Sequence, residues 1–242
     1  MSVRLDRLLA NLGYGSRREV QALIARGLVT LEGKRLDDPS AHVAVTADLP
    51  QRMQVAGAAI DPPPPLTLIM YKPLGVVCSH REAGRSVYEL LPERWRRRTP
   101  VLSTVGRLDA DTSGLLLMTD DGGFLHKVIS PRRHVPKMYI ADLEHDLAGH
   151  EGALFASGEL RLDGEDKPLA PANLAPIGPR RARLSITEGR YHQVRRMFAS
   201  AGNHVVSLHR EAIGALRLPA DLAPGAWRIA TVADIDLVFT PA

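Results

Sequence analysis

The chain has 242 residues, of which 45% are hydrophobic and 24% charged, a balance typical of a folded globular protein of one or two domains. It has no run of about 18 apolar residues that could cross a bilayer, and Arg4, Asp6 and Arg7 interrupt the start, where a secretion signal needs an apolar stretch. A single cysteine, Cys78, excludes an internal disulfide and a cysteine zinc site. We therefore expect a cytoplasmic protein without a membrane anchor, with Cys78 as a small apolar residue in a strand.

The first sixty residues predict a small module of two helices and a hairpin. Leucines recur at helical spacing through residues 5–12. Ser16 followed by Glu19 is the signature of a capping box and predicts the start of a second helix. The segment "LVTLEGKRL" then predicts a hairpin that turns near Gly33.

Basic residues lie outside the apolar stripes of this module. Together with the segment "GLVTLEGKRLDDPSAHV", the arrangement resembles the S4 RNA-binding domain. Such a module binds structured RNA through its shape and its phosphates rather than through a base code. The resemblance implies phosphate contacts by five basic residues of the module: Arg4, Arg17, Arg18, Lys34 and Arg35.

The clearest boundary in the sequence is "DPPPPL", since four consecutive prolines favour a stiff, extended spacer and cannot continue a helix or the interior of a sheet. We therefore expect an S4-like module in residues 1–60, a proline linker in residues 61–65 and a larger domain in residues 66–242.

The larger domain alternates strand-like runs with shorter helical segments, which predicts an α+β domain with helices packed on a mixed sheet. Its clearest helix is "RYHQVRRMFASAG", which carries one apolar stripe. The expected strands are Leu66–Tyr71, Leu115–Met118, Met138–Leu143, Ala182–Ile186 and Val205–Leu208.

The segment "GRLDADTSGLLLMTDDGG" carries four aspartates, Asp109, Asp111, Asp120 and Asp121. Their spacing matches a calcium-loop template. However, Leu115–Met118 reads as a buried strand inside that loop, and the last ligand position holds Asp instead of the usual Glu. We therefore disfavour calcium and interpret Asp120 and Asp121 as turn formers after a strand.

Basic residues are concentrated between residues 180 and 217, a segment that contains eight arginines and only two glutamates. Arginine presents a planar, permanently charged fork that suits phosphates. This excess indicates either a polyanionic partner or a solvated basic face, and charge alone does not separate the two.

Four segments in order resemble the pseudouridine synthases, the enzymes that isomerise uridine in RNA. They are "YKPLGVVCS", "GRLDADTSG", "KMY" and "EGRYHQVRRMFASAGNHVVSLHREAIG". An S4-like module precedes the catalytic domain in one subgroup of this family. The turn "LMTDDG" and the tail "ADLAPGAWR" are most similar to the members that modify small-subunit (16S) ribosomal RNA.

The resemblance implies an enzyme that needs no cofactor and no metal. It assigns the essential carboxylate to Asp109, a cation beside that carboxylate to Arg195, and a ring stacked on the uracil to Tyr139. Further RNA contacts are expected from Arg107, Arg196, Lys72, His192 and Arg210.

The expected partner is 16S ribosomal RNA within a partly assembled small subunit, and the expected state is a monomer. Two alternatives stay open: an enzyme for large-subunit (23S) ribosomal RNA, and a catalytically silent RNA-binding or ribosome-assembly protein.

Overall fold

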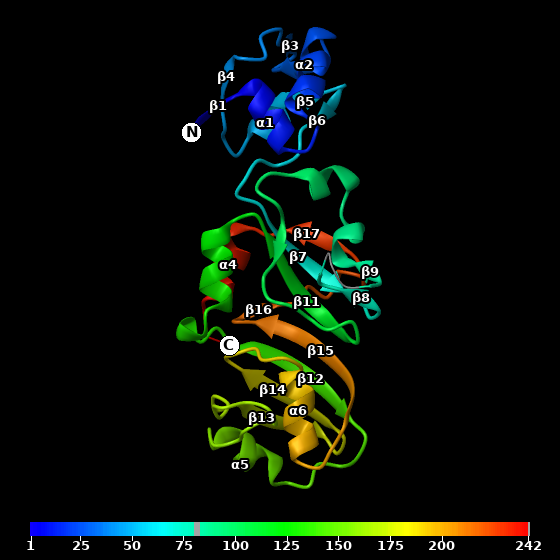
Figure 1. Ribbon diagram of the computed structural model, residues 1–242, viewed down its shortest axis with the longest axis vertical. Coiled ribbons are helices and arrows are strands. Elements are labelled where there is room, and N and C mark those ends of the chain that lie inside the picture. Colours follow the sequence, from blue (N-terminus) through cyan, green and yellow to red (C-terminus); the bar gives the residue numbers. More distant parts are fainter. Residues whose placement is uncertain (80–82, 242) are drawn as a thin grey trace. The chain divides into compact units, whose positions relative to one another are not determined.

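The computed structural model describes residues 1–79 and 83–241, which form two compact units that are described separately below (Figure 1). The first unit contains Met1–Thr67, Leu91–Ser103 and Thr119–Asp121, and the second contains Leu68–Leu90, Thr104–Met118 and the chain from Gly122 onwards. Two segments from beyond the proline spacer therefore belong to the amino-terminal unit, which the expected boundaries do not anticipate. Within the described residues, no helix is both long and apolar enough to cross a bilayer.

The helices and hairpin expected in the first unit are present. Helices α1 (Leu5–Asn11) and α2 (Arg17–Ala25) follow the leucine pattern, and α2 begins with a complete capping box between Ser16 and Glu19. Strands β2 and β3 form the hairpin, whose turn residues Glu32 and Gly33 have φ of 52° and 75°. The other elements are β1 (Ser2–Arg4), β2 (Val29–Leu31), β3 (Lys34–Arg35), β4 (His42–Ala44), α3 (Leu49–Arg52), β5 (Met53–Val55) and β6 (Ala58–Ala59).

Ion pairs and hydrogen bonds join the two later segments of the first unit to each other and to its remainder. Arg94, in the short 3-10 helix η2 (Glu93–Arg97), donates to Asp61 at 2.5 and 2.8 Å. Arg98 pairs with Asp120 at 3.2 Å, and both side chains are fully buried. Asp120 also accepts the backbone N–H of Leu66 at 2.7 Å. Asp120 is thus more than the turn former that the sequence predicts, because its carboxylate joins two distant segments.

The second unit is built on a mixed sheet with the strand order β13-β14-β12-β15-β11-β7-β17. Strands β11 and β15 are parallel, whereas β12, β13 and β14 pair antiparallel. All five predicted strands are found, while β13 and β17 were not predicted. The strands of this sheet are β7 (Thr67–Lys72), β10 (Ser103–Thr104), β11 (Thr112–Thr119), β12 (Lys137–Leu143), β13 (Asn173–Gly178), β14 (Arg181–Ile186), β15 (Val205–Ile213), β16 (Leu216–Arg217) and β17 (Trp227–Ile229).

One apolar contact joins a helix to this sheet, and a second joins two of the helices to each other. Phe124 and Val128 of α4 (Gly122–Ile129) pack into one core with Leu115 and Leu117 of β11. Phe198 of α6 (Gln193–Ser200) meets Phe155 of α5 (Glu151–Ala156) edge to face, with 5.3 Å between ring centroids. The remaining elements are β8 (Val76–Val77), β9 (Arg85–Ser86), η1 (Val87–Leu90), η3 (Pro131–Arg133) and α7 (Val232–Val238).

Candidate active site

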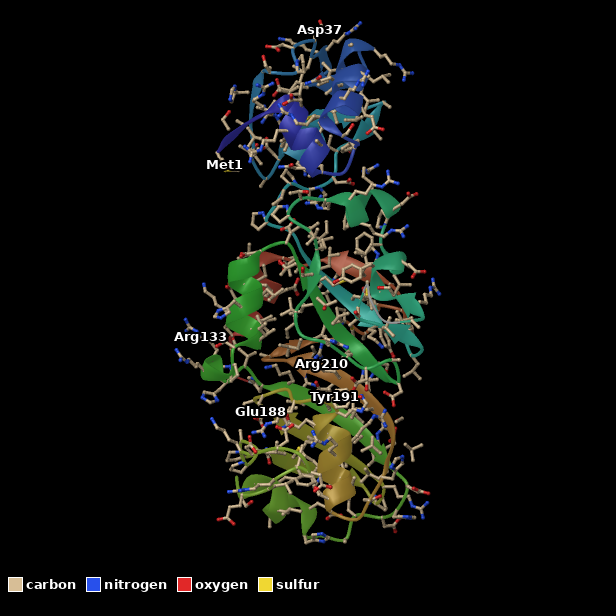
Figure 2. All side chains as sticks on the ribbon, viewed as in Figure 1. Met1, Asp37, Arg133, Glu188, Tyr191 and Arg210 are labelled. Atoms are coloured by element: carbon tan, nitrogen blue, oxygen red, sulfur yellow. The ribbon has the colours of Figure 1, made fainter. Side chains whose placement is uncertain are left out.

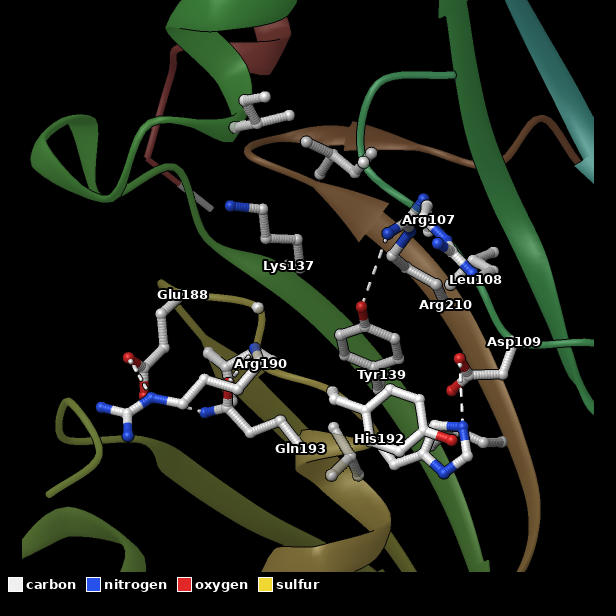
Figure 3. A pocket seen from close by; sticks show the side chains of 18 of the residues that line it. Arg107, Leu108, Asp109, Lys137, Tyr139, Glu188, Arg190, His192, Gln193 and Arg210 are labelled. Atoms are coloured by element: carbon white, nitrogen blue, oxygen red, sulfur yellow. Dashed lines mark hydrogen bonds and ion pairs between the residues drawn. The ribbon is translucent and has the colours of Figure 1, made fainter. Parts of the chain in front are cut away.

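A cavity of about 470 Å³ lies in the second unit beside strands β12 and β15, the loop that precedes β11 and the amino-terminal end of α6 (Figure 3). Six of the eight site residues expected in the larger domain line it. Its lining includes Arg107, Asp109, Lys137, Tyr139, Tyr191, His192, Arg195 and Arg210. Lys72 and Arg196 are not part of this lining.

The loop that carries Asp109 is held by the segment with the sequence "KPLGVVC". The N–H of Gly75 donates to the carbonyl of Ala110 at 2.7 Å. The ammonium group of Lys72 donates to the carbonyl of Thr112 at 2.8 Å, and the N–H of Leu108 donates to the sulfur of Cys78 at 3.5 Å. These three contacts hold both ends and the middle of the loop.

Lys72 and Cys78 therefore differ from what the sequence predicts. Lys72 is fully buried; burial lowers its pKa, and its electrostatic interactions with Cys78 and Asp109 partly oppose this. Because Lys72 has no exposed surface, it cannot reach a phosphate, and the expected RNA contact is wrong. Lys72 instead contacts the carbonyl of Thr112 and holds the loop of Asp109. Cys78 lies one residue after β8 rather than within a strand, and burial raises the pKa of its thiol.

Gly114 is the position in this region that requires glycine. It pairs with Arg210 across the parallel strands β11 and β15, and its φ is +114°. A Cβ atom at Gly114 would overlap the backbone carbonyl of Arg210. The glycine of the "TSG" motif thus lets β11 approach β15 at the point where Arg210 enters the cavity.

Asp109 lies at the edge of the cavity, with 33% of its side chain exposed. Its Oδ1 is 3.4 Å from Nε2 of His192 (Figure 3). His192 precedes α6 in the left-handed conformation, with φ of 49°, and its ring stacks on that of Tyr191 at 3.9 Å and 16°. The ring of His192, at the start of α6, thus faces a carboxylate, and its expected RNA contact stays a prediction.

Arg195 contacts a different aspartate from the one expected. Its Nη2 is 2.9 Å from Oδ2 of Asp111 and 3.0 Å from the Asp111 carbonyl, and its Nη1 donates to the carbonyl of Val205 at 2.8 Å. The ion pair of Arg195 is thus made with Asp111, two residues further along the loop from Asp109, and its expected role as the cation beside Asp109 stays a prediction. Sequence reasoning missed Asp111, although its position in the same motif was visible.

Tyr139 and Arg210 form the inner wall of the cavity. Both are buried, with 8% and 3% of their surfaces exposed. Arg210 donates through Nε to the carbonyl of Leu115 at 2.8 Å and through Nη1 to the Tyr139 hydroxyl at 3.5 Å. Its Nη2 is buried and has no hydrogen-bond partner among the described residues. This donor is available to a ligand.

Lys137 is a second cation in the cavity, and sequence reasoning assigned it no role. It lies two residues before Tyr139 on β12, so both side chains project from the same face of the sheet. Burial, reinforced by the charge of Arg210, lowers the pKa of Lys137 to about 8. The alternation of the strand is the signal that could have placed Lys137 beside Tyr139.

The basic excess of residues 180–217 is partly neutralised by acids from elsewhere in the chain. Arg196 contacts Glu165 at 3.2 Å, in addition to the carbonyls of Asp163 and Tyr191. Similar pairs join Arg180 to Asp146, Arg181 to Asp142 and Arg183 to Glu211. Outside this range, Arg107 is a basic residue of the cavity lining.

The basic residues of the first unit fall into two groups. Arg4 and Arg17 pair with the fully buried Asp6 at 3.1 and 2.8 Å. Burial alone would raise the pKa of Asp6, but these two arginines and a neighbouring amide hold it well below its usual range. Arg35 is paired with Asp37 at 2.7 Å. Arg18 and Lys34 are exposed, and their side chains make no hydrogen bond or ion pair within the described part of the chain.

The aspartates of the calcium template do not come together. Across residues 1–79 and 83–241, no group of three or more His, Cys, Asp or Glu side chains is arranged to hold a metal ion. Residues Leu115–Met118 are buried in β11, as a strand requires.

The sequence matches two known families. The model for RNA pseudouridylate synthase covers residues 67–200, and the model for the S4 domain covers residues 3–49. A solved structure described as a pseudouridylate synthase superimposes with a TM-score of 0.68 and 32% identity, over 98% of this chain and 99% of that one.

Curated relatives are similar over most of their length. The ribosomal small subunit pseudouridine synthase A of Yersinia pestis is 40% identical over 99% of both chains. The protein of the same name from Escherichia coli K12 is 47% identical over 71% of this chain and 73% of its own. The uncharacterized RNA pseudouridine synthase YtzG of Bacillus subtilis is 37% identical over 99% of both. Because the synthase model covers residues 67–200 and a relative is 40% identical over 99% of both chains, this chain belongs to the RNA pseudouridine synthase family.

Proposed function

We propose that this enzyme converts one specific uridine of small-subunit ribosomal RNA to pseudouridine, with Asp109 as the essential carboxylate. The observation that carries the proposal is the position of Asp109, on a loop held by residues 72–78 and at the edge of a cavity that also contains Tyr139. The choice of small-subunit RNA is supported by the names of the relatives from Yersinia pestis and Escherichia coli.

The chemistry requires few groups. The bond between C1′ and N1 of the uridine breaks, the uracil turns, and C1′ joins C5; C5 loses a proton and N1 gains one. No net oxidation occurs, so the reaction balances without a redox partner. A carboxylate is needed against the ribose, either as a nucleophile at the sugar or as a base that removes a sugar proton. Asp109 has this position in our proposal.

The inner wall would hold the detached base. We propose that the ring of Tyr139 stacks on the uracil and that its hydroxyl, fixed by Arg210 at 3.5 Å, relays the C5 proton. The unpaired Nη2 of Arg210 and the ammonium group of Lys137 are donors suited to the uracil carbonyl oxygens. Arg195 would act indirectly, because its contacts with Asp111 hold the loop of Asp109 in place.

RNA binding would involve both units. A uridine must leave its base stack to enter the cavity, and Arg107 at the lining is suited to hold the backbone of the extruded nucleotide. In the S4 domain, Arg18 and Lys34 are our first candidates for phosphate contacts, ahead of the acid-paired Arg4, Arg17 and Arg35. We further propose a monomer that acts in the cytoplasm on a partly assembled small subunit.

The test is to incubate the purified protein with small-subunit RNA, with large-subunit RNA and with partly assembled small subunits, and to map pseudouridine at single-nucleotide resolution. One new pseudouridine in small-subunit RNA, absent with Asp109→Asn, is expected. Modification restricted to large-subunit RNA would replace the proposed substrate. RNA binding without any pseudouridine would favour the silent RNA-binding protein instead.

A further inference from the structure

Tyr191, labelled in Figure 2, is an exposed aromatic residue that lines the cavity. Its side chain is 74% accessible to solvent, although the cavity beside it buries Tyr139 almost completely. One face of its ring is covered by the imidazole of His192, with 3.9 Å between centroids and 16° between planes. The imidazole of His192 therefore lies between the tyrosine ring and Asp109, because its Nε2 is 3.4 Å from the Asp109 carboxylate.

The backbone on either side of Tyr191 is fixed before any ligand arrives. The N–H of Arg190 donates to Gln193 at 2.9 Å, and the Arg190 guanidinium is held by Glu165 at 3.2 Å. The carbonyl of Tyr191 itself accepts a hydrogen bond from Arg196 at 3.3 Å. The exposed ring is thus carried on a rigid segment rather than on a free loop tip.

An exposed aromatic ring on a rigid segment binds one chemical class of ligand well. A rigid aromatic ring with an open face binds flat, π-rich groups, and each nucleobase presents such a face. Stacking of this kind tolerates any base, so it can operate next to a site whose selectivity lies elsewhere. The target uridine leaves its own stack when it enters the cavity, and its neighbour in the strand then loses a stacking partner.

We propose that Tyr191, supported by His192, is a stacking subsite for the nucleobase adjacent in the RNA strand to the uridine in the cavity. The inference rests on the proposed function. Tyr191 acts in binding and positioning, and no bond is made or broken at it. Its ring replaces the stacking partner that the neighbouring base loses. This favours the RNA with the uridine in the cavity over the RNA with the uridine still stacked in the strand.

The first experiment uses a fragment of small-subunit RNA that the wild-type protein modifies. The base on one side of the target uridine, and then on the other, is replaced by the fluorescent base 2-aminopurine or by an abasic nucleotide. Binding is measured in the Asp109→Asn background, so that no turnover occurs. The variants are Tyr191→Leu, which lacks the ring, Tyr191→Phe, which keeps it, and Ile177→Ala, a remote change at an exposed residue of β13.

On intact RNA, Tyr191→Leu is expected to weaken binding about 5- to 150-fold, the equivalent of the ~1–3 kcal/mol that one base–aromatic stack contributes. Tyr191→Phe and Ile177→Ala should bind like the parent protein. On RNA that is abasic at the stacked position, the parent protein and the Tyr191→Leu variant should bind equally. The fluorescence of 2-aminopurine at that position should be quenched by the parent and by Tyr191→Phe, and not by Tyr191→Leu.

The outcomes separate the two proposals. If the wild-type protein forms pseudouridine while Tyr191→Leu binds intact RNA as tightly as the parent and quenches 2-aminopurine as strongly as the parent, the subsite is refuted and the proposed function stands. If the wild-type protein forms no pseudouridine in small-subunit RNA, the proposed function fails and the subsite fails with it. Because Tyr191 is exposed, thermal unfolding of its variants should match that of the parent.

Discussion

Arg195 and Asp111 are joined by an ion pair of 2.9 Å, and the same guanidinium also donates to the backbone carbonyl of Asp111 at 3.0 Å. The pair connects α6 to the loop of Asp109. Arg195→Met should therefore slow single-turnover pseudouridine formation strongly, because the loop loses its contact with the helix. Asp111→Asn should cost less, since the carbonyl contact remains.

A double-mutant cycle of these two changes checks the relationship. We expect a coupling of about 0.5–3 kcal/mol in the activation free energy, the range for residues in one contact network. Strictly additive effects would mean that the two residues act independently and that Arg195 serves some other group.

Asp109→Asn should abolish activity while RNA binding and stability change little. The substitution is nearly isosteric, the side chain is one-third exposed, and the loop contacts of residues 72–78 do not involve its carboxylate. A fall in the single-turnover rate of about 10⁴-fold or more is the scale expected when an essential nucleophile or base is removed. A tenth of the wild-type rate in this variant would show that the central carboxylate lies elsewhere.

Gly114→Ala should destabilise the protein, because φ of +114° is strained for any side chain and the new Cβ would meet the carbonyl of Arg210. The backbone conformation alone costs about 1–3 kcal/mol, and chemical denaturation would measure the total. Gly122→Ala is the matched control, since a Cβ there meets no atom within 4 Å at the start of α4. Equal stability of the two variants would contradict the close approach at Gly114.

Lys137→Met should stabilise the protein at neutral pH and progressively less at alkaline pH. Burial, with the charge of Arg210, lowers the pKa of Lys137 from 10.5 in the unfolded chain to about 8. Below pH 8 the folded state holds a charged ammonium group in a poorly solvated place. Between pH 8 and 10.5 the unfolded state binds the proton and the folded state does not, so wild-type stability gains with rising pH.

Urea denaturation of the wild-type protein and of Lys137→Met at pH 7 and pH 10 would measure this difference. Other titrations are shared by both proteins and cancel in the comparison. A stability difference that does not change with pH would show that Lys137 is not desolvated in the folded state.

Arg18→Ala and Lys34→Ala should each make the salt dependence of RNA binding shallower. When one phosphate contact is lost, RNA binding releases fewer counterions. The slope of log affinity against log salt then becomes shallower by about 0.7–0.9. Arg52→Ala is the control within the same unit, because Arg52 is already paired with Glu32 and Asp48. Unchanged slopes for Arg18 and Lys34 would exclude this face of the S4 domain from phosphate binding.

The elements that the sequence predicts well are those defined by local signals. The capping box of Ser16 and Glu19 and the leucine spacing before it need no distant partner, and both appear as expected. By contrast, β17 has three residues and exists through its pairing with Leu68–Met70 of β7, far away in the sequence. Its length is too short for any periodicity to be visible.

The same distinction applies to the site. The resemblance to the family motifs was enough to predict that Asp109 and Tyr139 belong to one site, and both line the same cavity. The partner of Arg195 was not predictable in this way, because Asp109 and Asp111 are two residues apart on a loop, where helical or strand periodicity does not determine which carboxylate faces α6. Likewise, counting arginines along the chain could not reveal the acids that other elements bring to them.

The contacts made by Gly75, Lys72 and Cys78 keep the loop of Asp109 ordered without RNA. Fixing the backbone of one residue costs about 1–2 kcal/mol of conformational entropy, and here that loss occurs when the chain folds. RNA binding does not have to supply it again. The free energy of the protein–RNA contacts therefore remains available for extracting the uridine from its stack, a step that itself costs about a few kcal/mol.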